Sequence, residues 1–151
     1  MLCALLLGGT AHAIDVTIFG SGWSPSIGVV NLLAGAGSDF ISAYDNSSNP
    51  GTITISGTSG DSDAWRVDVR RTDGIWHGNL ALSAKRTGDG AGPGSISGGE
   101  TYQVVATTDS AFFSGAGDKG NVPIQLELGG VSLQVPPGNY STTITYTVVD
   151  L

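Results

Sequence analysis

The most regular alternation of apolar and polar residues lies near the C-terminal end of the chain, over residues 140–149. Ile144, Tyr146 and Val148 fall on one face and threonines fall on the other, and this period of two predicts a β-strand. Most of these residues are β-branched or aromatic, which are the types that favour strands. A turn rich in proline and glycine, residues 135–139, precedes the strand. We expect this segment to be the closing strand of an antiparallel sheet.

A second alternating segment, residues 14–19, stands alone before a Gly-Ser-Gly break. Its apolar face consists of Ile14, Val16 and Ile18. Such a strand can pair within its own chain as the first strand of a sandwich. Alternatively, it can add to the exposed edge of a neighbouring subunit, with the glycines as a hinge. The sequence leaves both outcomes open.

Shorter alternating segments separated by turn residues recur along the rest of the chain, and none of them has a sustained helical period. The segment around Trp65 alternates clearly, and we expect the Trp65 side chain to face the core. Residues 101–107 are expected to form another strand, with Tyr102, Val104 and Ala106 on one face. About eight or nine short strands of this kind predict an all-β, Ig-like antiparallel β-sandwich.

Length, composition and charge fit one folded domain. The chain has 151 residues, of which 24 are glycine, 40% are hydrophobic and 13% are charged. Frequent glycine suits many turns between short strands. The net charge of -7 argues against nucleic acid or anionic lipid as the main partner. Residues 87–100 are rich in glycine and serine, and we expect them to form a long mobile loop.

Residues 1–13 have the features of a secretory signal peptide with a truncated basic region. An apolar run over residues 2–9, too short to span a bilayer, precedes small residues at the positions that a signal peptidase reads. We expect cleavage after Ala13, which leaves a secreted or cell-surface domain of residues 14–151 with no membrane anchor. Cys3 lies in the signal, so the mature domain has no cysteine for disulfides or thiolate metal sites.

No residue pattern predicts catalysis, a metal or a cofactor. The mature domain has one histidine, His77, and no nucleophile-elbow motif, so we expect neither a Ser-His-Asp triad nor a zinc site. Loop carboxylates such as Asp61 and Asp118 lack EF-hand spacing, and the sequence leaves a calcium site undecided. We therefore expect a protein that is not an enzyme.

Two tryptophans near glycine turns, Trp23 and Trp76, offer aromatic faces that could stack on sugar rings. They support an alternative function, that of a monomeric surface module that binds cell-wall glycan or another carbohydrate.

The closing segment, with its Pro-Pro-Gly-Asn-Tyr turn at 136–140 and its Thr/Val strand, resembles the final strand of secreted pilin-like domains such as spore coat protein U and related fimbrial subunits. The resemblance implies a structural subunit of an extracellular filament, pilus or surface coat, in which each subunit donates a strand to the next copy of itself. The implied donor residues are Ile14, Val16 and Ile18. The implied edge of the acceptor groove consists of Ile144, Tyr146 and Val148. Whether assembly needs a chaperone or usher stays open.

A second resemblance is to the WxL cell-wall-binding domain, which has two Trp-x-Leu motifs. Their equivalents would be Trp65-Arg66-Val67, after the polar turn at 60–63, and Tyr146-Thr147-Val148, before Asp150. This resemblance implies contact with the cell wall.

Overall fold

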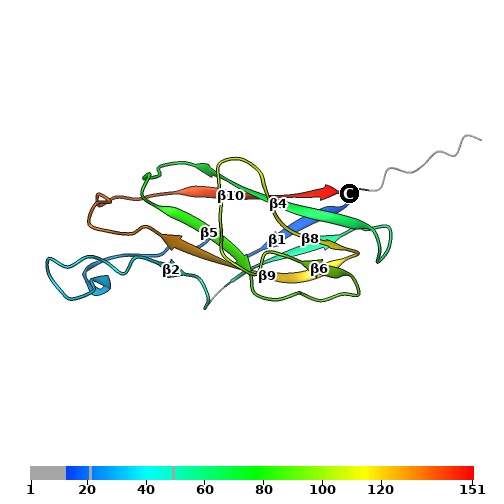
Figure 1. Ribbon diagram of the computed structural model, residues 1–151, viewed down its shortest axis with the longest axis horizontal. Helices are drawn as coiled ribbons and strands as arrows, with labels where there is room; N and C mark the ends of the chain where they lie inside the picture. The colour runs from blue at the N-terminus through cyan, green and yellow to red at the C-terminus, as the bar shows by residue number, and fades with distance from the viewer. Residues whose placement is uncertain (1–12, 21, 49) are drawn as a thin grey trace, which may run out of the picture.

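The structure is a computed structural model that describes residues 13–20, 22–48 and 50–151. The described residues contain ten β-strands in two antiparallel sheets, one of six strands and one of four, which lie face to face as a sandwich (Figure 1). The predicted all-β sandwich is therefore confirmed. A single 3-10 turn, η1 (Val29–Asn31), is the helical part of these residues. None of their helices is long and apolar enough to cross a bilayer.

The larger sheet has the order β1-β3-β9-β5-β7, and β2 also pairs with β9. Its strands are β1 (Asp15–Phe19), β2 (Tyr44–Asp45), β3 (Gly51–Ser56), β5 (Ala81–Arg86), β7 (Gln103–Val104) and β9 (Lys119–Gly129).

The smaller sheet has the order β10-β4-β8-β6. Its strands are β4 (Ala64–Asp73), β6 (Ser95–Ser97), β8 (Ser110–Ala116) and β10 (Thr142–Asp150).

The core lies between the sheets and is built from the inward positions of the long strands. Strand β3 contributes alternate isoleucines and β4 contributes alternate apolar residues, because successive side chains of a strand point to opposite faces. A register shift between β4 and β8 lets two consecutive phenylalanines of β8 both turn inward. The most completely buried of these side chains are Ile53, Ile55, Trp65, Val67, Val69 and Val122.

Trp65 is part of this core, as its alternating strand predicted. Its side chain is fully buried, and its Nε1 donates a hydrogen bond to the Gly117 carbonyl at 2.8 Å. Its ring meets Phe113 edge-on, with 6.0 Å between the ring centroids. A buried indole N–H needs such a partner, so the bond to Gly117 fixes the ring in place.

The strand expected over residues 101–107 is much shorter in the structure, and the face that carries Val104 lies outward. The strand is only the short β7, and Val104 is 61% exposed whereas Val105 is fully buried. The chain leaves the sheet here because Arg71 of the opposite sheet holds it. The Arg71 backbone N–H donates to the Ala106 carbonyl at 2.8 Å, and Arg71 Nε donates to the Val105 carbonyl at 2.9 Å.

The prediction of one long mobile loop over residues 87–100 is also wrong, because β6 lies within it and pairs with β8. Arg86, at the end of β5, anchors the segment. Its buried guanidinium donates to the Gly98 carbonyl and to the carboxylates of Asp89 and Glu100. The segment therefore crosses from one sheet to the other and becomes an edge strand.

Candidate functional site

The candidate site is the side of the sandwich where β1 and β10 lie, which we call the shared edge. β1 ends the larger sheet and β10 ends the smaller one, and the two strands approach each other across the core. In Figure 1 the blue β1 and the red β10 run past one another near the C-terminus. The first and last strands of the described chain are thus brought to one place.

At the shared edge, β1 pairs with a strand of its own chain. It runs antiparallel to β3, from Asp15 opposite Ser56 to Phe19 opposite Thr52. This is the first of the two outcomes that the sequence left open, and it is the outcome in the single chain.

The predicted donor residues differ in their burial. Ile14 and Val16 are partly buried and pack against the core cluster. Ile18 lies opposite the buried Ile53 but is 50% exposed, and the neighbouring Phe19 is 54% exposed. The strand is therefore held by two apolar side chains at its start, and its other end is open to solvent.

The residues predicted to line the acceptor groove also reach the core. Ile144, Tyr146 and Val148 are partly buried and pack against the same cluster as Ile14 and Val16. The Tyr146 ring lies 6.2 Å from the Phe112 ring, centroid to centroid. Burial raises the pKa of Tyr146 well above its ordinary value, because the phenolate loses its hydration there.

A glycine joins β1 to the rest of the chain. Gly20 has a φ of +117°, a conformation that side-chain-bearing residues rarely adopt, and a Cβ there would lie 3.2 Å from the Gly51 Cα. The next residue, at position 21, lies outside the described residues. The chain bends at Gly20, directly after β1, in the place where the sequence predicted a hinge.

The two tryptophans predicted to contact glycan are both partly exposed. The Trp76 Nε1 donates to the Leu80 carbonyl at 3.1 Å, and the Arg71 guanidinium lies 5.0 Å from the centroid of the Trp76 ring. One face of Trp76 is therefore covered by a cation. Trp23 lies in the irregular segment after β1.

His77 has a local structural contact. Its Nδ1 accepts a hydrogen bond from the Asn79 backbone N–H at 3.2 Å, and its ring meets Tyr140 edge-on at 6.3 Å between centroids. Within the described ranges, no three His, Cys, Asp or Glu side chains lie where they could hold a metal ion.

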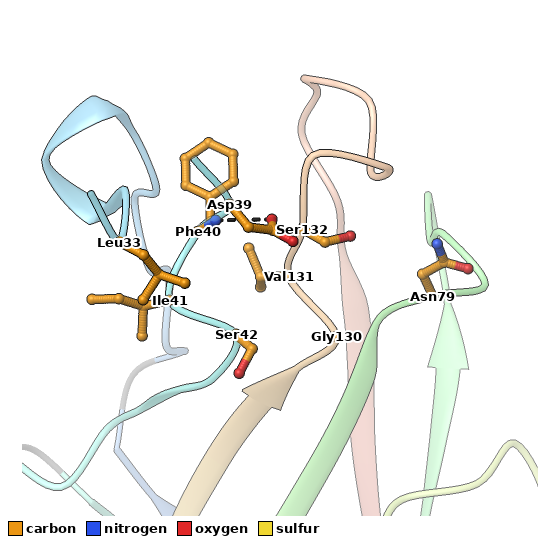
Figure 2. A pocket seen from close by; sticks show the side chains of 9 residues that line it. All are labelled: Leu33, Asp39, Phe40, Ile41, Ser42, Asn79, Gly130, Val131 and Ser132. Atoms are coloured by element: carbon orange, nitrogen blue, oxygen red, sulfur yellow. Dashed lines mark hydrogen bonds between the residues drawn. The ribbon is translucent and has the colours of Figure 1, made fainter. Parts of the chain in front are cut away.

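Sequence reasoning missed a hollow of about 500 Å³ at one end of the sandwich (Figure 2). Its wall is largely apolar and includes Leu33, Ile41 and Val131. The one acidic side chain in the wall, Asp39, accepts hydrogen bonds from the backbone N–H groups of Phe40 and Leu133, at 2.9 and 3.0 Å. No periodic pattern marks this wall, because it is assembled from irregular segments far apart in the sequence.

No protein-family model, curated protein or solved structure gives a significant match to this chain.

Proposed function

We propose that this chain is a secreted, non-catalytic structural subunit that assembles head to tail by exchange of β1 between copies. In the assembled form, β1 of one copy occupies the place next to β3 of the following copy. The observation that carries the proposal is the position of β1. It is a short edge strand followed directly by a glycine of positive φ, and its Val16 side chain packs against the apolar core.

The core under β1 makes a vacant edge costly. Ile53 and Ile55 of β3, directly opposite Ile18 and Val16, are 1% and 0% exposed. Without β1 these side chains would lose Ile18 and Val16 as neighbours on one side and become partly accessible to water, and full exposure of one such side chain costs roughly 1.5–3 kcal/mol. A copy that has given up its β1 is therefore driven to take the β1 of another copy.

Exchange between copies restores the same contacts that exist within one chain, so each joint has little net enthalpic cost. The shared edge is then formed by β1 of one copy and β10 of the next copy. The two copies therefore contribute different surfaces to the joint. A head-to-tail contact of this kind grows into a fibre unless its rotation closes a ring. The predicted signal peptide supports assembly outside the cell, and the expected homopolymer agrees with the resemblance to pilin-like subunits.

The first test is negative-stain microscopy of the chain starting at Ile14 beside a version that starts at residue 21. We expect filaments from the first version and none from the second. Soluble monomers from the first version, with an unfolded or aggregated second version, would show that β1 only completes its own sandwich. Binding to glycan would then be the function to examine.

An engineered disulfide distinguishes the two positions of β1 directly. Asp15 and Ser56 are opposite each other on the outer face of the β1–β3 pair, and the mature domain has no native cysteine. In the double variant Asp15→Cys/Ser56→Cys, oxidation of assembled protein is expected to give a ladder of covalent oligomers on a non-reducing gel. Oxidation of monomers before assembly is expected to lock β1 in its own chain and to prevent filaments until a reductant is added.

A pair of single substitutions tests the role of the inward side chains of β1. Val16→Asp places a charge against the core, whereas Thr17→Asp places the same charge on the exposed face of the same strand. We expect Val16→Asp to abolish filaments and Thr17→Asp to retain them. Equal assembly of both variants would contradict the proposal.

A further inference from the structure

The outer edge of β10 is the longest unpaired strand edge in the described part of the molecule. β10 pairs with β4 over its whole length, from Thr142 opposite Asp73 to Asp150 opposite Trp65. No strand among the described residues pairs with its other side. It has 9 residues, whereas β1, β2, β6 and β7, the other strands with one unpaired side, have 5, 2, 3 and 2.

Backbone hydrogen bonds at the two ends of β10 show which of its residues direct their N–H and C=O groups toward β4 and which direct them to the open side. The Ser141 backbone N–H donates to the Ile75 carbonyl at 2.7 Å. The Leu151 backbone N–H donates to the Ala64 carbonyl at 3.1 Å. Both bonds are on the β4 side, so the odd-numbered residues face β4. Because this direction alternates along an antiparallel strand, the even-numbered residues within 142–150 point their N–H and C=O groups to the open side.

This open edge lacks the features with which proteins usually block strand addition. Residues 142–149 contain no charged residue and no proline. The opposite edge of the same sheet is different, because the short β6 lies between Pro93 and two glycines with positive φ, Gly98 and Gly99. A long, uncharged and β-branched edge can accept another strand along its whole length.

We infer that this edge pairs antiparallel with the same edge of a second copy of the chain, across a two-fold axis at Tyr146. In that register Ile144 lies opposite Val148 of the second copy, and Thr145 lies opposite Thr147 of the second copy. The outward residues of both strands then exchange about ten backbone hydrogen bonds. Each four-stranded sheet continues into the sheet of the other copy.

The neutrality of β10 and the symmetry of the register fit a second copy in this orientation. The chain has a net charge of -7, so two copies repel each other except where their surfaces are neutral. β10 is neutral up to Asp150, its one charged residue. Antiparallel pairing places Asp150 opposite Thr142 of the second copy, whereas parallel pairing would bring the two Asp150 carboxylates together. Threonines opposite each other on the outer face are a favourable cross-strand pair.

The contact is separate from the proposed exchange of β1, because β1 pairs with β3 in the other sheet. A chain whose β1 is locked to β3 by the oxidised Asp15→Cys/Ser56→Cys pair cannot exchange that strand. A dimer of the locked chain therefore does not depend on exchange of β1, whether or not the chain forms filaments, and substitutions in β10 then show whether it uses the β10 edge.

The experiment is sedimentation velocity of the locked chain over a concentration series. We expect a reversible dimer. Adding Thr145→Lys and Thr147→Lys sets lysines opposite each other across the two-fold axis, and we expect the dissociation constant to rise at least about tenfold. The matched control adds Ser95→Lys and Ser97→Lys to β6, the other edge of the same sheet, and should dimerise like the locked chain.

Amide hydrogen exchange of the locked chain gives an independent measurement that needs no substitution in β10. We expect the amides of Ile144, Tyr146 and Val148 to exchange more slowly at high than at low protein concentration. The odd-numbered amides of β10 should be protected at both concentrations. A chain that stays monomeric, a dimer that survives the two β10 lysines, a polydisperse aggregate, or even-numbered amides whose exchange is independent of concentration would each overturn the inference.

Discussion

The ring of Trp65 lies directly over a residue that has no side chain. A Cβ at position 115 would lie 2.6 Å from Trp65 Cζ2 and would also overlap the Ser95 carbonyl of the neighbouring strand β6. Gly115 pairs with Trp65 in the β4–β8 register, so the close approach belongs to the regular sheet. Glycine is needed here for space rather than for its backbone freedom.

Gly115→Ala is therefore expected to destabilise the fold by about 2–3 kcal/mol, because the fully buried Trp65 has no room to move aside. Urea unfolding followed by tryptophan fluorescence measures this change. Gly60→Ala is the matched control, since a Cβ there meets no atom within 4 Å. It should change the free energy of unfolding by less than about 1 kcal/mol. Similar losses in both variants would contradict the packing argument.

The raised pKa of Tyr146 predicts how the stability of the fold changes at alkaline pH. Burial raises its pKa above the ordinary value of 10.0, so the folded chain retains a proton that the unfolded chain releases above that pH. Burial also raises the pKa of Tyr44 and Tyr102. The contribution of these three tyrosines to the free energy of unfolding is fully present below pH 10 and is lost as the pH rises above that value.

Urea unfolding from about pH 9 to about pH 11 should therefore show falling stability, and Tyr146→Phe should reduce the slope. Tyr146→Phe keeps the ring against Phe112 and removes only the titrating group. An unchanged slope would show that Tyr146 titrates normally in the folded chain.

At the scale of elements, Arg86 joins β5 to the segment that carries β6. Its side chain is 3% exposed, while those of its partners Asp89 and Glu100 are 69% and 71% exposed. The carboxylates can be hydrated when the arginine is absent, but the Gly98 carbonyl loses its donor. The geometry of the crossing between the sheets therefore depends on the arginine more than on either acid.

Arg86→Met should cost about 2–4 kcal/mol of stability, because it removes a buried donor with several acceptors. Glu100→Gln should cost less than about 1 kcal/mol, because an exposed partner contributes little. Urea unfolding of the two variants gives the comparison. The idea that Arg86 anchors this segment would be wrong if the two costs were equal.

At the scale of the whole molecule, charge acts against association. The four arginines all form ion pairs, and the 13 acidic residues outnumber the 6 basic ones. No lysine or arginine precedes Arg66 in the sequence. Copies of the chain therefore repel each other at long range, and both proposed contacts form against this repulsion.

Raising the ionic strength from about 0.01 M to about 0.3 M should strengthen self-association, because the Debye length falls below about 10 Å and the repulsion is screened. Light scattering measures this for the unmodified chain, and sedimentation measures it for the locked chain. Weaker association at high salt would instead indicate that attractive ion pairs hold the copies together.

The sequence alone determined the fold class and the inward faces of the most regular strands. The alternation around Trp65 and along β10 placed Trp65, Ile144, Tyr146 and Val148 correctly against the core. This was possible because the direction of a side chain in a strand depends only on its position in a period of two. The two ends of the chain were also recognised as strands for this local reason.

Only the tertiary structure decided which strands are neighbours and where strands end. Val105 is buried and Val104 is exposed because Arg71, which is distant in sequence, donates hydrogen bonds to the Val105 and Ala106 carbonyls. In the same way, residues 95–97 become a strand because β8 and Arg86 provide partners for that segment. The pairing of β1 with β3 and the unpaired side of β10 likewise depend on residues that are far apart in the sequence. A local period fixes the face of a strand, but its partner depends on residues far away in the chain.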